Sequence, residues 1–145
     1  MQMKLFILTF DFFRDRYPDT PYSIASVLAS IKKNPELYNL QTEHESINLS
    51  VLHEKYKNDS TQIEKNAFLA AKKVVIEKCW DSNYLAIGIT AWSEVYIKKL
   101  LPFLKNNFKG KLIAGGYEVT AIDDNKRRIS WVSFLYKRIF GNCYW

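Results

Sequence analysis

Two adjacent glycines, Gly115 and Gly116, are the residues of this sequence best suited to holding a ligand. Glycine has no Cβ, so its backbone reaches positive φ angles and allows a ligand to approach closely. If a helix begins just after the pair, its first N–H groups would point at a phosphate or another polar group. The alternative is a tight turn between a strand and a helix, which is the commonest use of glycine. The sequence contains neither G-x-G-x-x-G nor G-x-x-x-x-G-K-[ST], which disfavours a dinucleotide site and a P-loop.

Carboxylates and imidazoles offer a second kind of chemistry. Asp11 and Asp15 could form an acidic pocket for Mg²⁺. Only one of them can stand directly at the end of a strand, however, so a solvated loop is the preferred interpretation. His44 and His53 could bind a metal or act as a base, but no third ligand has a suitable spacing. Their polar neighbours favour a solvated edge of a sheet instead.

The composition describes one folded domain. The chain has 145 residues, of which 48% are hydrophobic, and this argues against disorder along its whole length. Its two cysteines have neither zinc-site nor C-x-x-C spacing, so we expect a reduced protein of the cytoplasm. No run approaches the roughly 20 apolar residues of a transmembrane helix. The net charge of +6 favours acidic partners, but we expect neither nucleic acid nor a membrane as a partner.

Apolar runs and helical periodicity alternate along the chain. The runs at 5–10 and 84–89 predict strands that are buried on both faces, whereas 40–49 is polar enough for an edge strand. A fourth strand is predicted at 111–114. Helices are expected between these strands, with three apolar faces: Ile24, Val27, Leu28 and Ile31; Ile63, Ala67, Ala70, Ala71, Val74 and Val75; and Val95, Tyr96 and Leu100.

Capping residues and a proline predict where the helices begin and end. Thr20 before a proline suits the start of the first helix. The second helix is expected to begin at the capping box from Thr61 to Glu64. Ser93 or Thr90 would open the third helix, and Pro102 should kink or end it.

The alternation of strands and helices predicts an α/β three-layer sandwich with a mostly parallel sheet. In such sheets, ligands bind beyond the carboxyl ends of the strands, so three loops should meet at one edge. The candidate ligand contacts at that edge are Phe10, Asp11, Thr90, Ala91, Trp92, Ser93, Gly115, Gly116, Tyr117 and Glu118. Trp92 would either stack on a flat ligand or cover the core, and the sequence favours neither role.

Three segments resemble a known family. The segments 21–25, 85–93 and 111–120 look like the N-terminal cobalamin-binding domain of B12-dependent radical SAM proteins, and the strand that ends in Gly-Gly-x-Glu-Val-Thr matches best. The resemblance covers about residues 1–122. It implies a flavodoxin- or Rossmann-like sheet of four to five strands in the order 2-1-3-4, with any fifth strand at the far edge.

The same resemblance implies a site for a corrinoid over the carboxyl ends of the strands. Thr90, Trp92 and Ser93 would flank the cofactor. Gly115, Gly116 and Glu118 would line the pocket for its nucleotide tail.

The chain also departs from the family. Thr42 and Val51 stand where an Asp-x-His-x-x-Gly motif would need aspartate before His44 or His53, so no axial histidine is expected. Two cysteines cannot supply the three-cysteine motif of a radical SAM barrel, which excludes its iron–sulfur cluster.

We therefore expect a cobalamin-binding module that is not catalytic alone and works with a separate radical SAM protein or with a second copy of itself. Residues 123–145 form a basic, aromatic segment, either a helix packed on the domain or a truncated end. The alternative is a protein-interaction module on the same fold, which would bind no cofactor and would dock partners through the apolar side of this segment.

Overall fold

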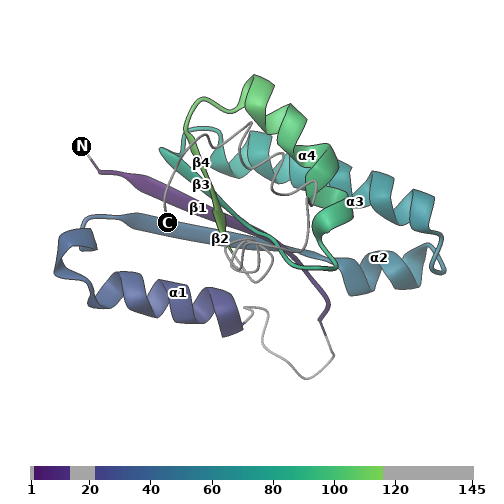
Figure 1. Ribbon diagram of the computed structural model, residues 1–145, viewed down its shortest axis with the longest axis horizontal. Coiled ribbons are helices and arrows are strands. Elements are labelled where there is room, and N and C mark those ends of the chain that lie inside the picture. Colours follow the sequence, from purple (N-terminus) through teal and green to yellow (C-terminus); the bar gives the residue numbers. More distant parts are fainter. Residues whose placement is uncertain (1, 14–21, 116–145) are drawn as a thin grey trace, which may run out of the picture.

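The computed structural model describes residues 2–13 and 22–115, and within them four strands and four α-helices (Figure 1). The strands are β1 (Lys4–Asp11), β2 (Gln41–Asn48), β3 (Tyr84–Gly88) and β4 (Lys111–Gly115), and the helices are α1 (Tyr22–Lys33), α2 (Leu49–Lys55), α3 (Ser60–Val74) and α4 (Glu94–Asn107). A 3-10 turn, Pro35–Leu37, follows α1, and a π-helical turn, Val75–Cys79, follows α3. The predicted cap at Thr20, the candidate contacts Gly116, Tyr117 and Glu118, and the segment 123–145 lie outside the described residues.

All three strand pairings are parallel, and the strands lie in the order β2-β1-β3-β4. This confirms the predicted α/β, flavodoxin/Rossmann-like fold with strand order 2-1-3-4. The polar strand β2 lies at an edge of the sheet, as its sequence indicated. Because the strands are parallel, their carboxyl ends all meet at one edge.

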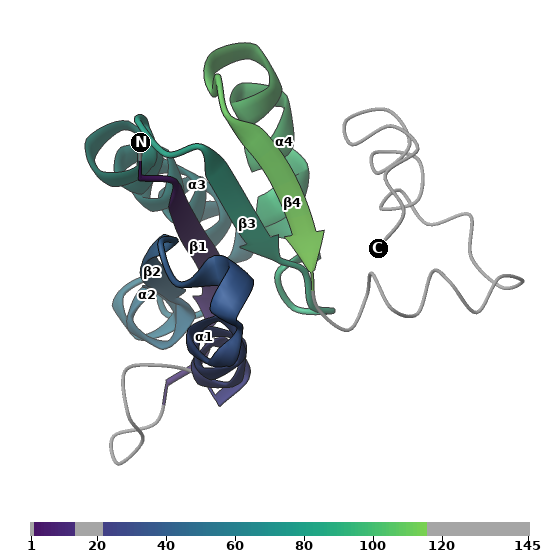
Figure 2. The same ribbon diagram turned by 90° about the vertical axis from the view of Figure 1, so that its left-hand side faces the viewer.

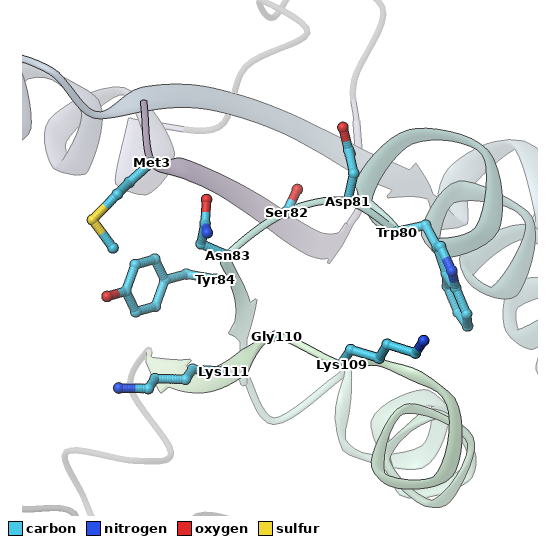
Figure 3. Close-up of a pocket in the computed structure, with 9 residues that line it drawn as sticks. All are labelled: Met3, Trp80, Asp81, Ser82, Asn83, Tyr84, Lys109, Gly110 and Lys111. Carbon is cyan, nitrogen blue, oxygen red and sulfur yellow. The ribbon is translucent and has the colours of Figure 1, made fainter. Parts of the chain in front are cut away.

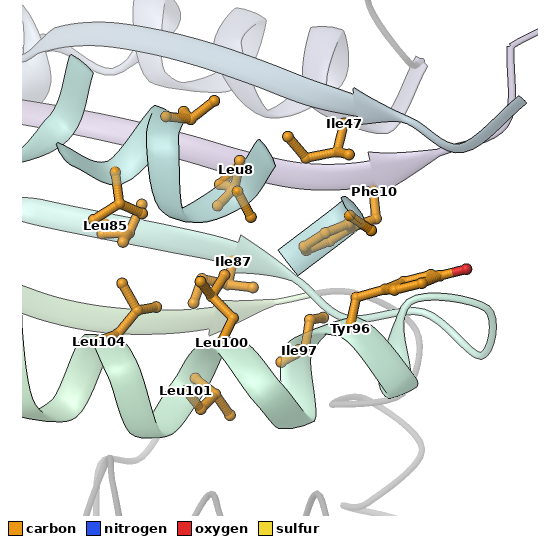
Figure 4. Packing of buried hydrophobic residues seen from close by; sticks show 14 of the residues in the cluster. Leu8, Phe10, Ile47, Leu85, Ile87, Tyr96, Ile97, Leu100, Leu101 and Leu104 are labelled. Carbon is orange, nitrogen blue, oxygen red and sulfur yellow. The ribbon is translucent and has the colours of Figure 1, made fainter. Parts of the chain in front are cut away.

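Helices cover both faces of the sheet (Figure 2). Phe6, Leu8 and Phe10 of β1 point into the larger core, which α3 and α4 cover (Figure 4). Leu5 and Ile7 alternate with them and pack against α1 on the other face. The continuous apolar run of β1 is thus explained by burial on both faces.

The start of α3 corrects the predicted capping box. The helix begins at Ser60, and its N-cap is Asp59, whose side chain accepts hydrogen bonds from the backbone N–H groups of Thr61 (3.1 Å) and Gln62 (3.3 Å). A carboxylate two residues earlier competes with the Thr61 hydroxyl and also suits the positive end of the helix dipole. The sequence reading also missed α2, which is only seven residues long and is capped by the Asn48 side chain.

Two predicted core residues were wrong, and of the kink or end predicted at Pro102 the end does not occur. Val27 and Val95 are each 49% exposed, because they lie at the borders of the apolar faces of α1 and α4. Pro102 does not end α4, which continues to Asn107. Over the described ranges, no helix has the length and the apolar character to cross a membrane.

Candidate functional site

The segment after β3 is hydrogen-bonded to the ends of β1 and β4 at the carboxyl edge of the sheet. The indole Nε1 of Trp92 donates a hydrogen bond of 2.9 Å to the carbonyl of Phe10 at the end of β1. The N–H of Ile89 donates to the carbonyl of Gly115 at 2.7 Å. The structure therefore places three of the described candidates, Phe10, Trp92 and Gly115, at the same edge of the sheet.

The turn between β3 and α4 is built around the Ser93 hydroxyl. Ser93 is completely buried, and its Oγ accepts hydrogen bonds from the N–H of Thr90 (2.8 Å) and from its Oγ1 (3.1 Å). Its own proton has the carbonyl of Thr90 (3.1 Å) as an acceptor. Ser93 thus precedes α4, as predicted, but its hydroxyl holds the turn closed and makes no capping bond to the helix.

Trp92 is a fixed ring that is half open to solvent. Its side chain is held by the bond to Phe10, yet the residue is 50% exposed. The Phe10 ring is buried and stacks on Tyr96, with the ring centroids 5.4 Å apart. Burial raises the pKa of the Tyr96 phenol above its usual value. Trp92 therefore covers the end of β1 and also presents an open aromatic surface.

Small and hydroxyl side chains form a row at the same end, on the face that α1 covers. This hydroxyl-glycine row crosses all four strands and consists of Ser46, Thr9, Gly88 and Gly115. Thr9 Oγ1 donates to a carboxylate oxygen of Asp11 at 2.5 Å and lies 2.7 Å from Ser46 Oγ. Since the single proton of Thr9 goes to Asp11, the Ser46 hydroxyl donates to Thr9.

Close packing requires glycine at one of the two described glycine positions of this row but not at the other. A Cβ on Gly88 would lie 2.7 Å from the Cγ2 methyl of Thr9, so close packing requires glycine there. A Cβ on Gly115 would meet no described atom within 4 Å, and this residue has no left-handed backbone. No described residue therefore covers the side of Gly115 that faces away from the α3–α4 core.

The sequence reading missed Thr9, Ser46 and Gly88 as parts of this edge. Two signals were present: a hydroxyl interrupting the apolar run of β1, and a glycine near the end of an apolar strand, which marks a close approach. Ser46 follows from the register alone, because it is the neighbour of Thr9.

The histidines lie elsewhere. His44 is in the middle of the edge strand β2, beside Ile7 in the register. His53 is in α2, with its ring 5.2 Å from that of Phe12 and its Nδ1 3.0 Å from Asn58 Oδ1. Within residues 2–13 and 22–115, no group of three or more His, Cys, Asp or Glu side chains could hold a metal ion.

The groups at the carboxyl edge are suited to binding. They comprise one carboxylate, two linked hydroxyls, an open aromatic ring and an open glycine backbone. They can orient a ligand by hydrogen bonds and stacking.

Comparisons with known proteins identify no relative of this chain. The chain matches no family model, no curated protein and no solved structure. The fold thus defines the class, an α/β domain with a parallel four-stranded sheet of the flavodoxin/Rossmann-like kind.

Proposed function

We propose that this domain is a non-catalytic module that binds a corrinoid, cobalamin, across the carboxyl edge of its sheet. The observation that carries the proposal is the side of Gly115 that no described residue covers, beside the segment that presents Trp92. A large planar ligand needs both a flat apolar surface and a place where the backbone can be approached.

The residues at this edge fit such a group in three ways. Thr90 and Ala91 lie beside Trp92 in a turn that internal hydrogen bonds hold rigid, so the aromatic surface needs little ordering on binding. Asp11 is partly exposed at the end of β1 and can accept hydrogen bonds from amide side chains of a corrin. Gly115 leaves room for the nucleotide tail beside β4.

Each part of the chain would have a limited role. Trp92 would stack against the ligand, Asp11 would orient it, and Gly115 would leave space for its tail. When bound, a corrinoid supplies methyl-group or electron-transfer chemistry at its cobalt. The domain would present it to a separate radical SAM protein or to a second copy, in the cytoplasm, where the free thiol of Cys79 would stay reduced.

A titration with hydroxocobalamin tests the proposal. The purified chain should bind it with a saturable change in the visible absorbance spectrum and a calorimetric signal. Gly115→Leu should abolish binding, because the leucine fills the open side without meeting a described atom. Lys105→Leu, the same side chain at an exposed position of α4, is the matched control and should bind like the parent.

Two outcomes would refute the corrinoid proposal. One is no binding at high micromolar hydroxocobalamin. The other is equal binding by the parent and by a folded Gly115→Leu variant. The far-ultraviolet circular dichroism and the melting temperature of each variant show whether it has folded.

A protein-interaction module is the second candidate. Four large apolar side chains follow the carboxyl ends of the strands and remain about half exposed: Phe12, Val51, Trp92 and Val95. This favours a protein partner, since exposed apolar surface marks such sites. Phe12→Ser with Val95→Ser, or deletion of 126–145, should then disrupt a dimer or a complex seen by sedimentation. If all three proteins sediment alike as monomers, and bind the same partners in pull-downs, the candidate is refuted.

A further inference from the structure

A cavity of about 480 Å³ lies at the opposite end of the sheet, where β1, β3 and β4 begin. Figure 3 shows Met3 and Tyr84 on one side of it, Trp80 and Lys109 on the other, and Ser82 between them. We propose that this cavity binds a small organic anion that carries a planar ring. The site is distinct from the carboxyl edge and does not rest on the corrinoid proposal.

Backbone hydrogen bonds from three strands fix the walls of the cavity. The side-chain oxygen of Asn83 accepts a hydrogen bond of 2.8 Å from the backbone N–H of Lys4. The backbone N–H of Asn83 donates a hydrogen bond of 3.0 Å to the Lys4 carbonyl. Its carbonyl accepts from Lys111 at 2.9 Å. Gly110 closes the wall, because its lack of a side chain lets the chain pass against the carbonyl of Ser82. The walls are thus formed before any ligand binds.

The charge around the cavity is positive. Lys109 and Lys111 line it, are exposed, and form no ion pair with any residue that the structure describes. The one carboxylate of the lining, Asp81, already pairs with Lys4 at 3.3 Å. Lys4 also pairs with Glu43. Two ammonium groups therefore remain to attract an anion.

The Ser82 hydroxyl near the cavity is closed off. Ser82 is only 4% exposed, and its Oγ is buried with no hydrogen-bond partner among the described residues. A ligand in the cavity is therefore held by the lysines and the Trp80 ring and not by this hydroxyl.

The ring is inferred from Trp80. This side chain is 43% exposed at the border of the cavity, and the side chain of Lys109 extends toward it. An aromatic face beside an ammonium group suits a ligand that combines a planar ring with negative charge. The anionic group is a phosphate or a carboxylate, since both offer the same acceptor oxygens.

Calorimetric titrations of the full chain with two probes test the inference. Adenosine monophosphate carries a ring and a phosphate, and 2-naphthoate carries a ring and a carboxylate. Saturable binding of either one supports the site, and the tighter ligand identifies the anionic group. The inference is overturned if neither probe binds at millimolar concentration. It is also overturned if adenosine or inorganic phosphate alone binds as tightly as the better probe, because ring and charge must both contribute.

Two variants locate the binding. Lys109→Ala should weaken the binding of the better probe by about fivefold or more, as expected for a hydrogen bond to a charged group. Lys65→Ala removes the same charge from an exposed position of α3 outside the lining and should bind like the parent. Equal affinity in Lys109→Ala and the parent would overturn the site.

Two further variants separate this site from its alternatives. Ser82→Ala should bind the better probe like the parent, because its hydroxyl is buried and out of reach of the ligand. A clear loss of affinity in this variant would contradict the binding mode proposed here. Gly115→Leu should leave the affinity for the better probe unchanged, so failure of the corrinoid proposal and failure of this one give different results.

Discussion

Replacing Gly110 with alanine should destabilise the fold where β3 meets β4. A Cβ at this position would lie 2.6 Å from the carbonyl oxygen of Ser82 and 2.7 Å from that of Asn83. Optimal contacts between carbon atoms are about 3.5–4.0 Å, so both approaches are far too short. Because both oxygens belong to the backbone, no flexible side chain can move away. The Gly110 segment must shift, and the bond from Lys111 N–H to the Asn83 carbonyl will weaken with it.

The expected magnitude follows from two opposing effects. Overpacking of this kind costs about 1–3 kcal/mol. The lower entropy of the unfolded alanine chain returns about 0.4–1 kcal/mol. We therefore expect a net loss of roughly 1–2 kcal/mol in the free energy of unfolding. With a urea m-value of about 2 kcal/mol/M, the midpoint of unfolding would fall by roughly 0.5–1 M.

Urea unfolding followed by circular dichroism measures this change, and Gly115→Ala is the matched control. The added Cβ at Gly115 meets no described atom within 4 Å, so its midpoint should stay within about 0.5 M of the parent value. If Gly110→Ala unfolds at the same urea concentration as the parent, with an unchanged m-value, our account of the close contact is incorrect.

Three further predictions concern the cap of α3, the buried thiol and the core. Asp59→Ala should lower the free energy of unfolding by about 1 kcal/mol, whereas Thr61→Ala should have a much smaller effect in the same urea experiment; the reverse order would restore the capping box. Burial raises the pKa of the Cys79 thiol to about 12, so the thiol of the unfolded chain ionises at a lower pH than that of the folded chain. A Cys143→Ser protein, which keeps Cys79, should therefore lose stability as the pH rises from about 9 toward 12. If its loss of stability equals that of a protein that also carries Cys79→Ala, this account is contradicted. Phe10→Ala should cost about 3–5 kcal/mol and prevent folding at moderate urea, and a cost below about 1 kcal/mol would show that the ring is not a core contact.

The fold could be predicted because two physical patterns agree along most of the chain. Nearly continuous apolar runs, as in β1 and β3, are typical of strands whose two faces are both covered, and this implies a parallel sheet between helices. The polar run of β2 then had to lie at an edge. The sheet order followed from the family resemblance and is confirmed by the pairing of the strands.

Local competition between residues explains the errors. Asp59 and Thr61 are both good caps, and only the three-dimensional start of α3 shows that the carboxylate accepts the two N–H groups. α2 has seven residues, too few for periodicity to reveal it. Val27 and Val95 are apolar at nearly the spacing of the buried face, but each lies one residue further around its helix and so faces solvent. Composition alone cannot resolve a rotation of that size.

The site was predicted less completely than the fold, because pairings across the sheet matter there. Trp92 was placed correctly at the edge, but nothing in the sequence indicated that its indole would bind the Phe10 carbonyl. Because of that bond, both expected roles of Trp92 are possible at once: it covers the end of β1 and keeps about half of its surface exposed. The link between Thr9 and Ser46 likewise depends on a register that joins residues 37 positions apart.

The three described glycines sharpen the argument for a ligand at Gly115. Gly88 and Gly110 are required by packing, because a Cβ at either would lie within 2.7 Å of a neighbouring atom. Gly115 has neither a close described neighbour nor a left-handed backbone, so neither of the usual structural reasons accounts for glycine there. The corrinoid proposal supplies one, which is close approach by a ligand. It requires Gly115→Ala to keep the stability of the parent and yet bind the corrinoid more weakly. An alanine variant that keeps both would show that the glycine serves no ligand.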